Sequence, residues 1–134
     1  PNAAVIELAT RHAARVLRKD DELGTLAPGK RADLLLLTKD PLADIHNDED
    51  HPSRAALVIE VADSSRVFDL GLKARLYAAA KIPEYWVVDL QTEKLVVHLD
   101  PKKGEYQRVH RFGKGREVTS AVAPKVTVRV AALF

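Results

Sequence analysis

The sequence contains no cysteine and no long hydrophobic run. The absence of cysteine excludes disulfide scaffolds, thiol catalysis and zinc sites built on thiolates, and it fits a cytoplasmic protein. The longest apolar runs fall far short of the roughly 20 residues that a membrane helix needs, and the first residues form no basic-then-apolar leader. We therefore expect neither a membrane span nor secretion. With 134 residues, 46% hydrophobic and 30% charged, the composition is that of one soluble globular domain.

Charge is unevenly distributed along the chain, although the net charge is only +2. From Pro101 onward there are 8 Lys or Arg residues against 2 Asp or Glu residues. A basic segment of this kind favours a polyanionic partner such as DNA. The alternative is a set of solvated basic side chains on exposed strands, which is common on ordinary protein surfaces.

The first third of the chain is predicted to form a helix, a turn and a strand. Apolar residues recur at helical spacing over residues 3–18, and Asn2 is placed to cap that helix. Pro28 and Gly29 predict a tight turn. The apolar run over residues 32–37 is interrupted only by Asp33, which predicts a strand buried on both faces. Residues 39–54 are polar and predict a connecting loop.

The remainder alternates between strands and one helix. Residues 56–61 predict a second buried strand, in which the carboxylate of Glu60 is out of place among apolar side chains. A helix is expected over residues 67–80, followed by strands over 85–88, 94–99, 105–112 and 126–130. The predicted fold is α+β: a mixed sheet with a central packed helix, then an antiparallel meander, plus the N-terminal helix.

The N-terminal segment resembles the C-terminal tail of metal-dependent amidohydrolases. The resemblance covers about residues 3–47 and rests on LGTLAPGKRADL (residues 23–34) and DPLADI (residues 40–45). In that family the metal ligands lie in an upstream barrel, so the resemblance implies a helix and strand without activity. We expect this segment, residues 1–47, to pack onto the rest as one compact unit.

Residues 48–134 resemble the Uma-two family of restriction-endonuclease-like proteins, which have a PD-(D/E)xK-type nuclease fold. The resemblance is carried by LVIEVADSS (residues 57–65), by Asp69, Lys73 and Tyr77, and by IPEYWVVD (residues 82–89). Family members usually run longer at the N-terminus, so this part looks like a truncated core. The resemblance implies hydrolysis of DNA phosphodiester bonds with Mg²⁺ or Mn²⁺.

The same resemblance implies a catalytic set. Glu60 matches the strand carboxylate of the family and would be a metal ligand. The usual Glu-x-Lys spacing would place lysine at position 62, where this chain has Ala62, so Lys73 would take the role of polarising water or phosphate. Asp33, 27 residues before Glu60, has the spacing of the second metal-binding carboxylate, although it lies in the amidohydrolase-like segment.

Each of these residues also has a purely structural interpretation. Glu60 could be a satisfied buried acid, Asp33 could cap the turn at Pro28 and Gly29, and Lys73 could pair with Asp69 four residues earlier. Tyr77, Tyr85 and Trp86 are expected in or beside the core. On the strand over 105–112, Tyr106, Arg108, His110 and Phe112 share one face by alternation, while Arg111 lies on the other. Arg108, Arg111 and Lys114 are candidates for nucleic-acid contact.

The sequence thus supports three functional hypotheses. The first is a metal-dependent endonuclease, the second is a catalytically incomplete nuclease fold or binding module, and the third is an amidohydrolase fragment. Geometry separates the first two, because a nuclease needs Glu60 near a second carboxylate and a cation, whereas a remnant leaves Glu60 salt-bridged or exposed without an acidic partner. Strand edges left exposed would allow a homodimer.

Overall fold

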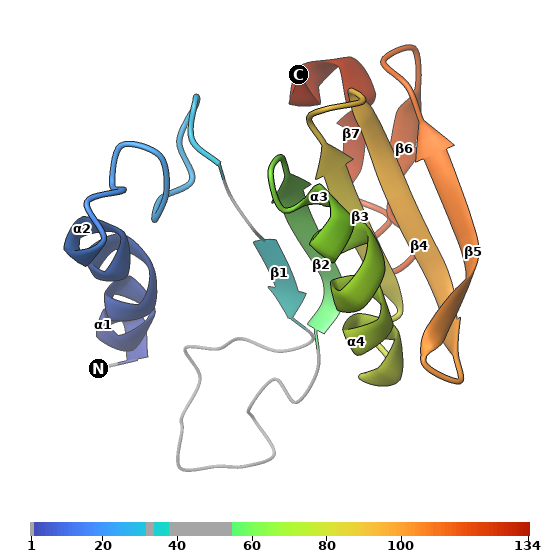
Figure 1. Cartoon of the computed structure of the whole chain (residues 1–134), viewed down its shortest axis with the longest axis horizontal. Helices are drawn as coiled ribbons and strands as arrows, with labels where there is room; N and C mark the ends of the chain where they lie inside the picture. Colours follow the sequence, from blue (N-terminus) through green and yellow to red (C-terminus); the bar gives the residue numbers. More distant parts are fainter. Residues whose placement is uncertain (1, 32–33, 38–54) are drawn as a thin grey trace.

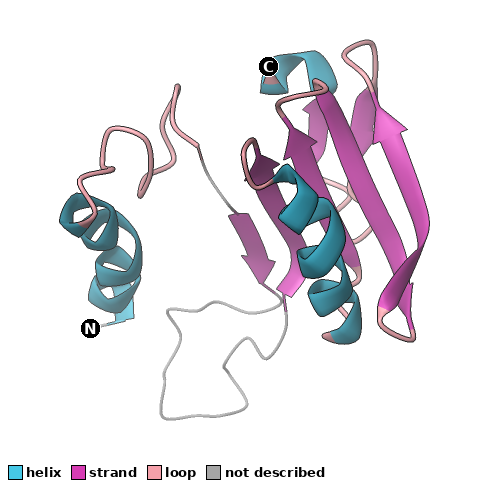
Figure 2. Cartoon of the chain, viewed as in Figure 1, coloured by secondary structure: helices cyan, strands magenta, loops and turns pink. Residues whose placement is uncertain are grey.

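The computed structural model describes residues 2–31, 34–37 and 55–134 (Figure 1). The strands are β1 (Leu34–Leu37), β2 (Ala55–Ala62), β3 (Glu84–Asp89), β4 (Lys94–Lys102), β5 (Glu105–Phe112), β6 (Glu117–Thr119) and β7 (Thr127–Arg129). The helical segments are α1 (Asn2–Glu7), η1 (Leu8–His12), α2 (Ala13–Val16), α3 (Arg66–Phe68), η2 (Asp69–Lys73), α4 (Ala74–Ala79) and the terminal turn η3 (Val130–Leu133). The α+β class predicted from the sequence is confirmed (Figure 2).

Five strands form one mixed sheet in the order β1-β2-β3-β4-β5. β2 and β3 are parallel, with Glu60 opposite Val87, and the other neighbouring pairs are antiparallel. Parallel neighbours need a crossover connection, which here is the helix formed by α3, η2 and α4. This helix covers one face of the sheet (Figure 1), so we call that side the helix face.

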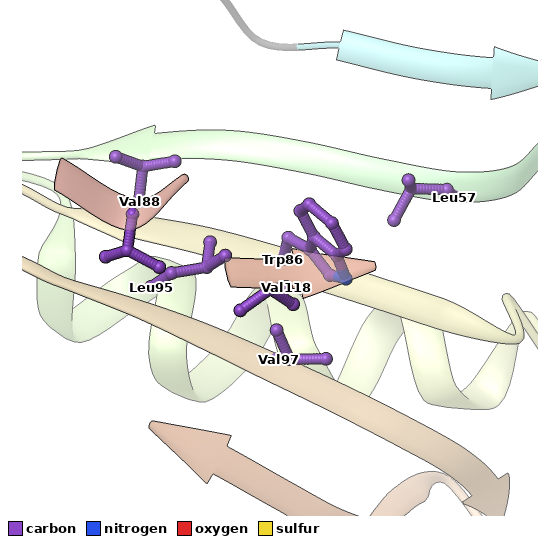
Figure 3. Packing of buried hydrophobic residues seen from close by; sticks show 7 residues of the cluster. Leu57, Trp86, Val88, Leu95, Val97 and Val118 are labelled. Carbon is purple, nitrogen blue, oxygen red and sulfur yellow. The ribbon is translucent and has the colours of Figure 1, made fainter. Parts of the chain in front are cut away.

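The sheet separates two apolar clusters. On the helix face, a cluster including Val58, Ala62 and Tyr85 packs against Ala74 of the helix. On the opposite face, Leu57, Trp86, Val88, Leu95 and Val97 pack against Val118 and Val130 (Figure 3). β6 and β7 pair antiparallel as a small second sheet, of which β6 was not predicted. The alternation along β2 therefore assigns even-numbered residues, including Glu60, to the helix face.

β1 forms as expected over Leu34–Leu37, but the prediction that it is buried on both faces is wrong. Leu35 is 64% exposed, and Leu34 and Leu36 are 36% and 38% exposed. Among the strands that the structure describes, β1 is at the edge of the sheet and pairs with β2 alone. An apolar run predicts a strand but does not reveal how many neighbours that strand has.

The N-terminal helix is confirmed as a continuous helical segment, α1–η1–α2. Its apolar stripe is largely exposed, with Val5 at 64% and Leu8 at 59%. Ala14 is buried, and the chain folds back on it at Gly24, where φ is +88° and a Cβ would lie 2.6 Å from the Ala14 Cβ. No helix in the described part of the chain is long and apolar enough to span a membrane.

Candidate active site

Glu60 lies near the C-terminal end of β2, with only 4% of its surface exposed. Its Oε2 is 2.6 Å from Lys73 Nζ, and its Oε1 accepts a hydrogen bond of 2.6 Å from the Tyr77 hydroxyl. The Tyr85 hydroxyl lies 3.4 Å from Oε2. A carboxylate buried in an apolar strand is costly without such partners, and here both oxygens are engaged.

Lys73 joins Glu60 to a second buried carboxylate. Its Nζ is 2.9 Å from Asp69 Oδ1, and Asp69 is only 1% exposed. The Ser65 hydroxyl donates a hydrogen bond to the other oxygen of Asp69. The predicted pairing of Lys73 with Asp69 is therefore present, and the same ammonium group also contacts Glu60. Two carboxylates thus converge on one cationic position.

Lys73 and Asp69 stabilise each other's charged forms. Burial alone would lower the pKa of Lys73, but hydrogen bonds to Glu60 and Asp69 outweigh it and raise that pKa above its usual value. Burial would raise the pKa of Asp69, but hydrogen bonds from Ser65 and Lys73 lower it overall. Lys73 is therefore an ammonium ion and Asp69 a carboxylate at neutral pH.

Two tyrosines border the cluster. The Tyr85 hydroxyl lies 3.1 Å from the backbone oxygen of Asp69, and its ring centroid is 4.9 Å from that of Tyr77. Burial, assisted by the charge of Glu60, raises the pKa of Tyr85, so its hydroxyl remains protonated. Tyr85 and Trp86 are buried, which confirms them as core aromatic residues, whereas Tyr77 is half-buried.

The helix supplies its polar partners at a regular spacing. Ser65, Asp69, Lys73 and Tyr77 follow one another every four residues, which places them along one side of the helix. Sequence reasoning weighed Asp69 only as a partner of Lys73 and did not assign Ser65 or Tyr77 to the site. The four-residue period was the available signal, because it aligns four polar side chains with the strand that carries Glu60.

The predicted second ligand, Asp33, lies outside the described residues. Within the ranges that the structure describes, no group of three or more His, Cys, Asp or Glu side chains could hold a metal ion. The described part of the site is thus Glu60 and Asp69 around Lys73, with hydroxyl groups at its border.

The three basic candidates for nucleic-acid contact do not form one patch. Arg108 Nε lies 3.7 Å from Asp100, and Lys114 Nζ lies 2.7 Å from Glu93. Arg111 instead lines a groove between the helix and β5.

The expected shared face of Tyr106 and Phe112 on β5 is wrong. The Tyr106 hydroxyl donates to the Ile82 backbone oxygen, and Tyr106 packs with the helix-face cluster. Phe112 packs with the cluster on the opposite face. β4 bends at Asp100, where φ is +65°, beside the pairing of Pro101 with Tyr106. Simple alternation therefore fails at this end of β5.

Comparison with known protein families identifies a match over most of the chain. The model of the Uma2 (Uma-two) family, described as a putative restriction endonuclease, matches residues 11–131. This match includes most of the segment that resembled an amidohydrolase tail, and nothing supports that second resemblance. No curated protein matches the chain.

Proposed function

The chain belongs to the Uma2 family, and on that premise we propose that it is a metal-dependent endonuclease that hydrolyses phosphodiester bonds in DNA. The observation that carries the proposal is the burial of Glu60 beside Lys73 on the helix face, where Asp69 shares the same ammonium group. Buried carboxylates that converge on a cation are a common arrangement in active sites.

The chemistry of the donor set fits a hard divalent cation. Mg²⁺ and Mn²⁺ prefer carboxylate oxygens, and Glu60 and Asp69 already face one cationic position. Asp33 directly precedes Leu34 in the sequence, and Leu34 pairs with Ile59, the neighbour of Glu60. We assign Glu60 and Asp33 as the ligands. The bound ion would stabilise charge on phosphate oxygens and lower the pKa of a water molecule.

Lys73 is the residue to which we assign polarisation of the water or the phosphate. Its raised pKa keeps the ammonium charged, and the ion pair with Asp69 holds it at the site independently of Glu60. The Tyr77 hydroxyl, which donates to Glu60 Oε1, orients the carboxylate. Asp69 and Tyr77 are thus positioning residues, because each acts through a neighbour.

One observation favours the second candidate function, a catalytically incomplete nuclease fold that only binds DNA. Both oxygens of Glu60 already have protein partners, and one partner is a cation. A buried ion pair of this kind can be purely structural.

Titration with Mg²⁺ and Mn²⁺ by calorimetry, together with cleavage of plasmid DNA, separates the two candidates. We expect the unmodified protein to bind an ion and the variants Glu60→Gln and Asp33→Asn to lose that binding. Cleavage by Glu60→Gln should fall by at least about a thousandfold, which corresponds to about 4 kcal/mol of transition-state stabilisation.

Asp63→Asn is the matched control, because it removes an exposed carboxylate three residues from Glu60. It should leave ion binding and cleavage unchanged. If the unmodified protein binds neither ion, the nuclease proposal fails and the binding module is favoured.

A further inference from the structure

A groove of about 410 Å³ lies between the helix and strands β4 and β5. Gly71 and Arg75 line it from the helix, His98 from β4, and Glu105, Tyr106 and Arg111 from β5. We propose that this groove binds a nucleotide unit through its phosphate, in addition to the site at Glu60. The choice of a nucleotide as the ligand rests on the proposed function, whereas the existence of the groove does not.

The arginines supply the reason for an anionic ligand. Arg75 and Arg111 are exposed, and neither forms an ion pair with another described residue, although Glu105 lines the same groove. Other arginines on and beside the sheet are paired, as Arg66 is with Asp89 and Arg108 with Asp100. A guanidinium group presents paired donors that match the oxygens of a phosphate. Two such groups on opposite walls can hold one phosphate between them.

His98 supplies a second, independent observation. It is only 5% exposed and lines the groove, yet its Nδ1 has no hydrogen-bond partner in the described structure. Burial lowers the pKa of His98 to about 4 even though a hydrogen bond with the Tyr85 backbone raises it, and the charge of Arg111 lowers it further, so the imidazole ring is neutral at physiological pH. A buried polar atom without a partner is rare in folded proteins and calls for an explanation. A ligand beside the ring would supply one.

The aromatic residues connect this groove to Glu60. The ring centroid of His98 lies 5.2 Å from that of Tyr85, with an angle of 28° between the rings, and 5.6 Å from that of Tyr106. The Tyr85 hydroxyl in turn approaches Glu60. Tyr106, which is half-buried and lines the groove, offers a ring on which a base can stack, whereas Tyr85 and His98 are buried and connect Tyr106 to the cluster around Glu60. The groove therefore offers both parts of a nucleotide a contact, close to the proposed catalytic residues.

Gly71 shows that the groove has free space at the helix. A Cβ built at this position meets no atom within 4 Å. Because Gly71 lines the groove and a Cβ there meets nothing, we expect a leucine at this position to occupy part of the groove.

The test is DNA binding in EDTA, so that no divalent ion takes part. Fluorescence anisotropy with a labelled DNA duplex compares the unmodified protein with the double variant Arg75→Gln/Arg111→Gln. Because hydrogen bonds between charged groups are worth about tenfold or more in affinity each, we expect the dissociation constant to rise about a hundredfold. The slope of affinity against salt concentration should fall by about 1 for each arginine.

The matched control is Arg116→Gln/Arg129→Gln, which removes the same charge from exposed positions at β6 and β7. It should bind DNA almost as well as the unmodified protein. Gly71→Leu should weaken binding, whereas Gly115→Leu, also placed in open space, should not. Equal losses in both double variants, or unchanged binding by Gly71→Leu, would overturn the proposal.

Two further arms identify the source of the phosphate. If a deoxynucleoside monophosphate displaces the duplex, the groove takes a free nucleotide; if only the duplex binds, it takes a strand phosphate. Both results support the proposal, and it is overturned if neither the duplex nor the monophosphate binds. Glu60→Gln should bind DNA normally in EDTA, so a failure of the metal-dependent reaction and a failure of the groove are separable.

Discussion

Two glutamates are buried on neighbouring strands of the same sheet, but on opposite faces. Glu60 in β2 faces the helix and contacts Lys73, with Asp69 beside it. Glu84 in β3 is 1% exposed and accepts hydrogen bonds from Trp86 Nε1 at 2.7 Å, Ser120 Oγ at 2.7 Å and Val122 N at 3.1 Å. Glu84 has no ion pair with any described residue.

The difference shows that burial of a carboxylate does not by itself mark a catalytic site. Glu84 accepts hydrogen bonds from neutral donors, and those from Ser120 and Val122 hold the segment after β6 against the sheet. These structural hydrogen bonds are sufficient to explain why Glu84 is buried. Glu60 shares a cation with a second carboxylate, which is an arrangement that a metal ion or a phosphate can use. What separates the two is the charge of the neighbours.

The largest expected effect on stability is that of Glu84→Ala. It leaves two buried donors, Trp86 Nε1 and Ser120 Oγ, and the partly buried Val122 N–H without an acceptor, and we expect a loss of about 4 kcal/mol in the free energy of unfolding. Urea denaturation followed by Trp86 fluorescence measures this directly, since Trp86 is the only tryptophan and bonds to Glu84.

Glu117→Ala is the control for that variant, because Glu117 is exposed and its ion pair with Arg129 is long, at 3.9 Å. It should cost less than about 1 kcal/mol. If Glu84→Ala kept its stability but lost cleavage activity, the comparison would be reversed, and Glu84 would belong to the site.

The sequence predicts one of these glutamates and not the other, for a physical reason. Glu60 is preceded by an apolar run, so a charge there is conspicuous, and its partners lie on a helix with a clear period. Glu84 follows Pro83, where a polar residue is typical of a turn, and the strand was expected to begin at Tyr85. Its partners Ser120 and Val122 are 36 and 38 residues away, in a segment without periodicity.

The strands show the same contrast: features set by local sequence patterns could be predicted, whereas features set by distant partners could not. β2 and β4 could be placed because alternation and apolar runs are local patterns. β7 could also be placed, because it lies within the alternating stretch over residues 126–130, whereas β6 has only three residues and depends on its pairing with β7. The exposure of β1 likewise depends on its position in the sheet, and the role of Asp33 stays a prediction.

A second prediction is that His98, on the helix face, makes the free energy of unfolding depend on pH. The pKa of His98 is about 4 in the folded protein, against about 6.5 when unfolded. The unfolded chain therefore binds more protons between these values, so stability should fall as the pH drops from about 6.5 to about 4, by up to about 3 kcal/mol. Asp69 and Asp89, whose pKa values are lowered, lose their contributions only below about pH 4.

Urea denaturation at a series of pH values measures this, and His98→Gln should flatten the profile between pH 6.5 and 4. His110→Gln, which changes an exposed histidine on β5, should leave the profile unchanged. An unflattened profile for His98→Gln would mean that the loss of stability does not arise from His98.

The smallest expected effect concerns the open space beside Gly71 on the helix face. Gly71 lies within the helix at η2, and a Cβ there meets nothing within 4 Å. Alanine is a better helix former than glycine by about 1 kcal/mol, so Gly71→Ala should stabilise the protein by about 0.5–1 kcal/mol.

Gly104→Ala is the control. Gly104 also has open space, but its φ is +81°, so this substitution should destabilise the protein by about 1 kcal/mol. Opposite signs in urea denaturation would show that backbone conformation, and not space, distinguishes the two positions. A loss of stability in Gly71→Ala would instead show that the groove is closed in solution.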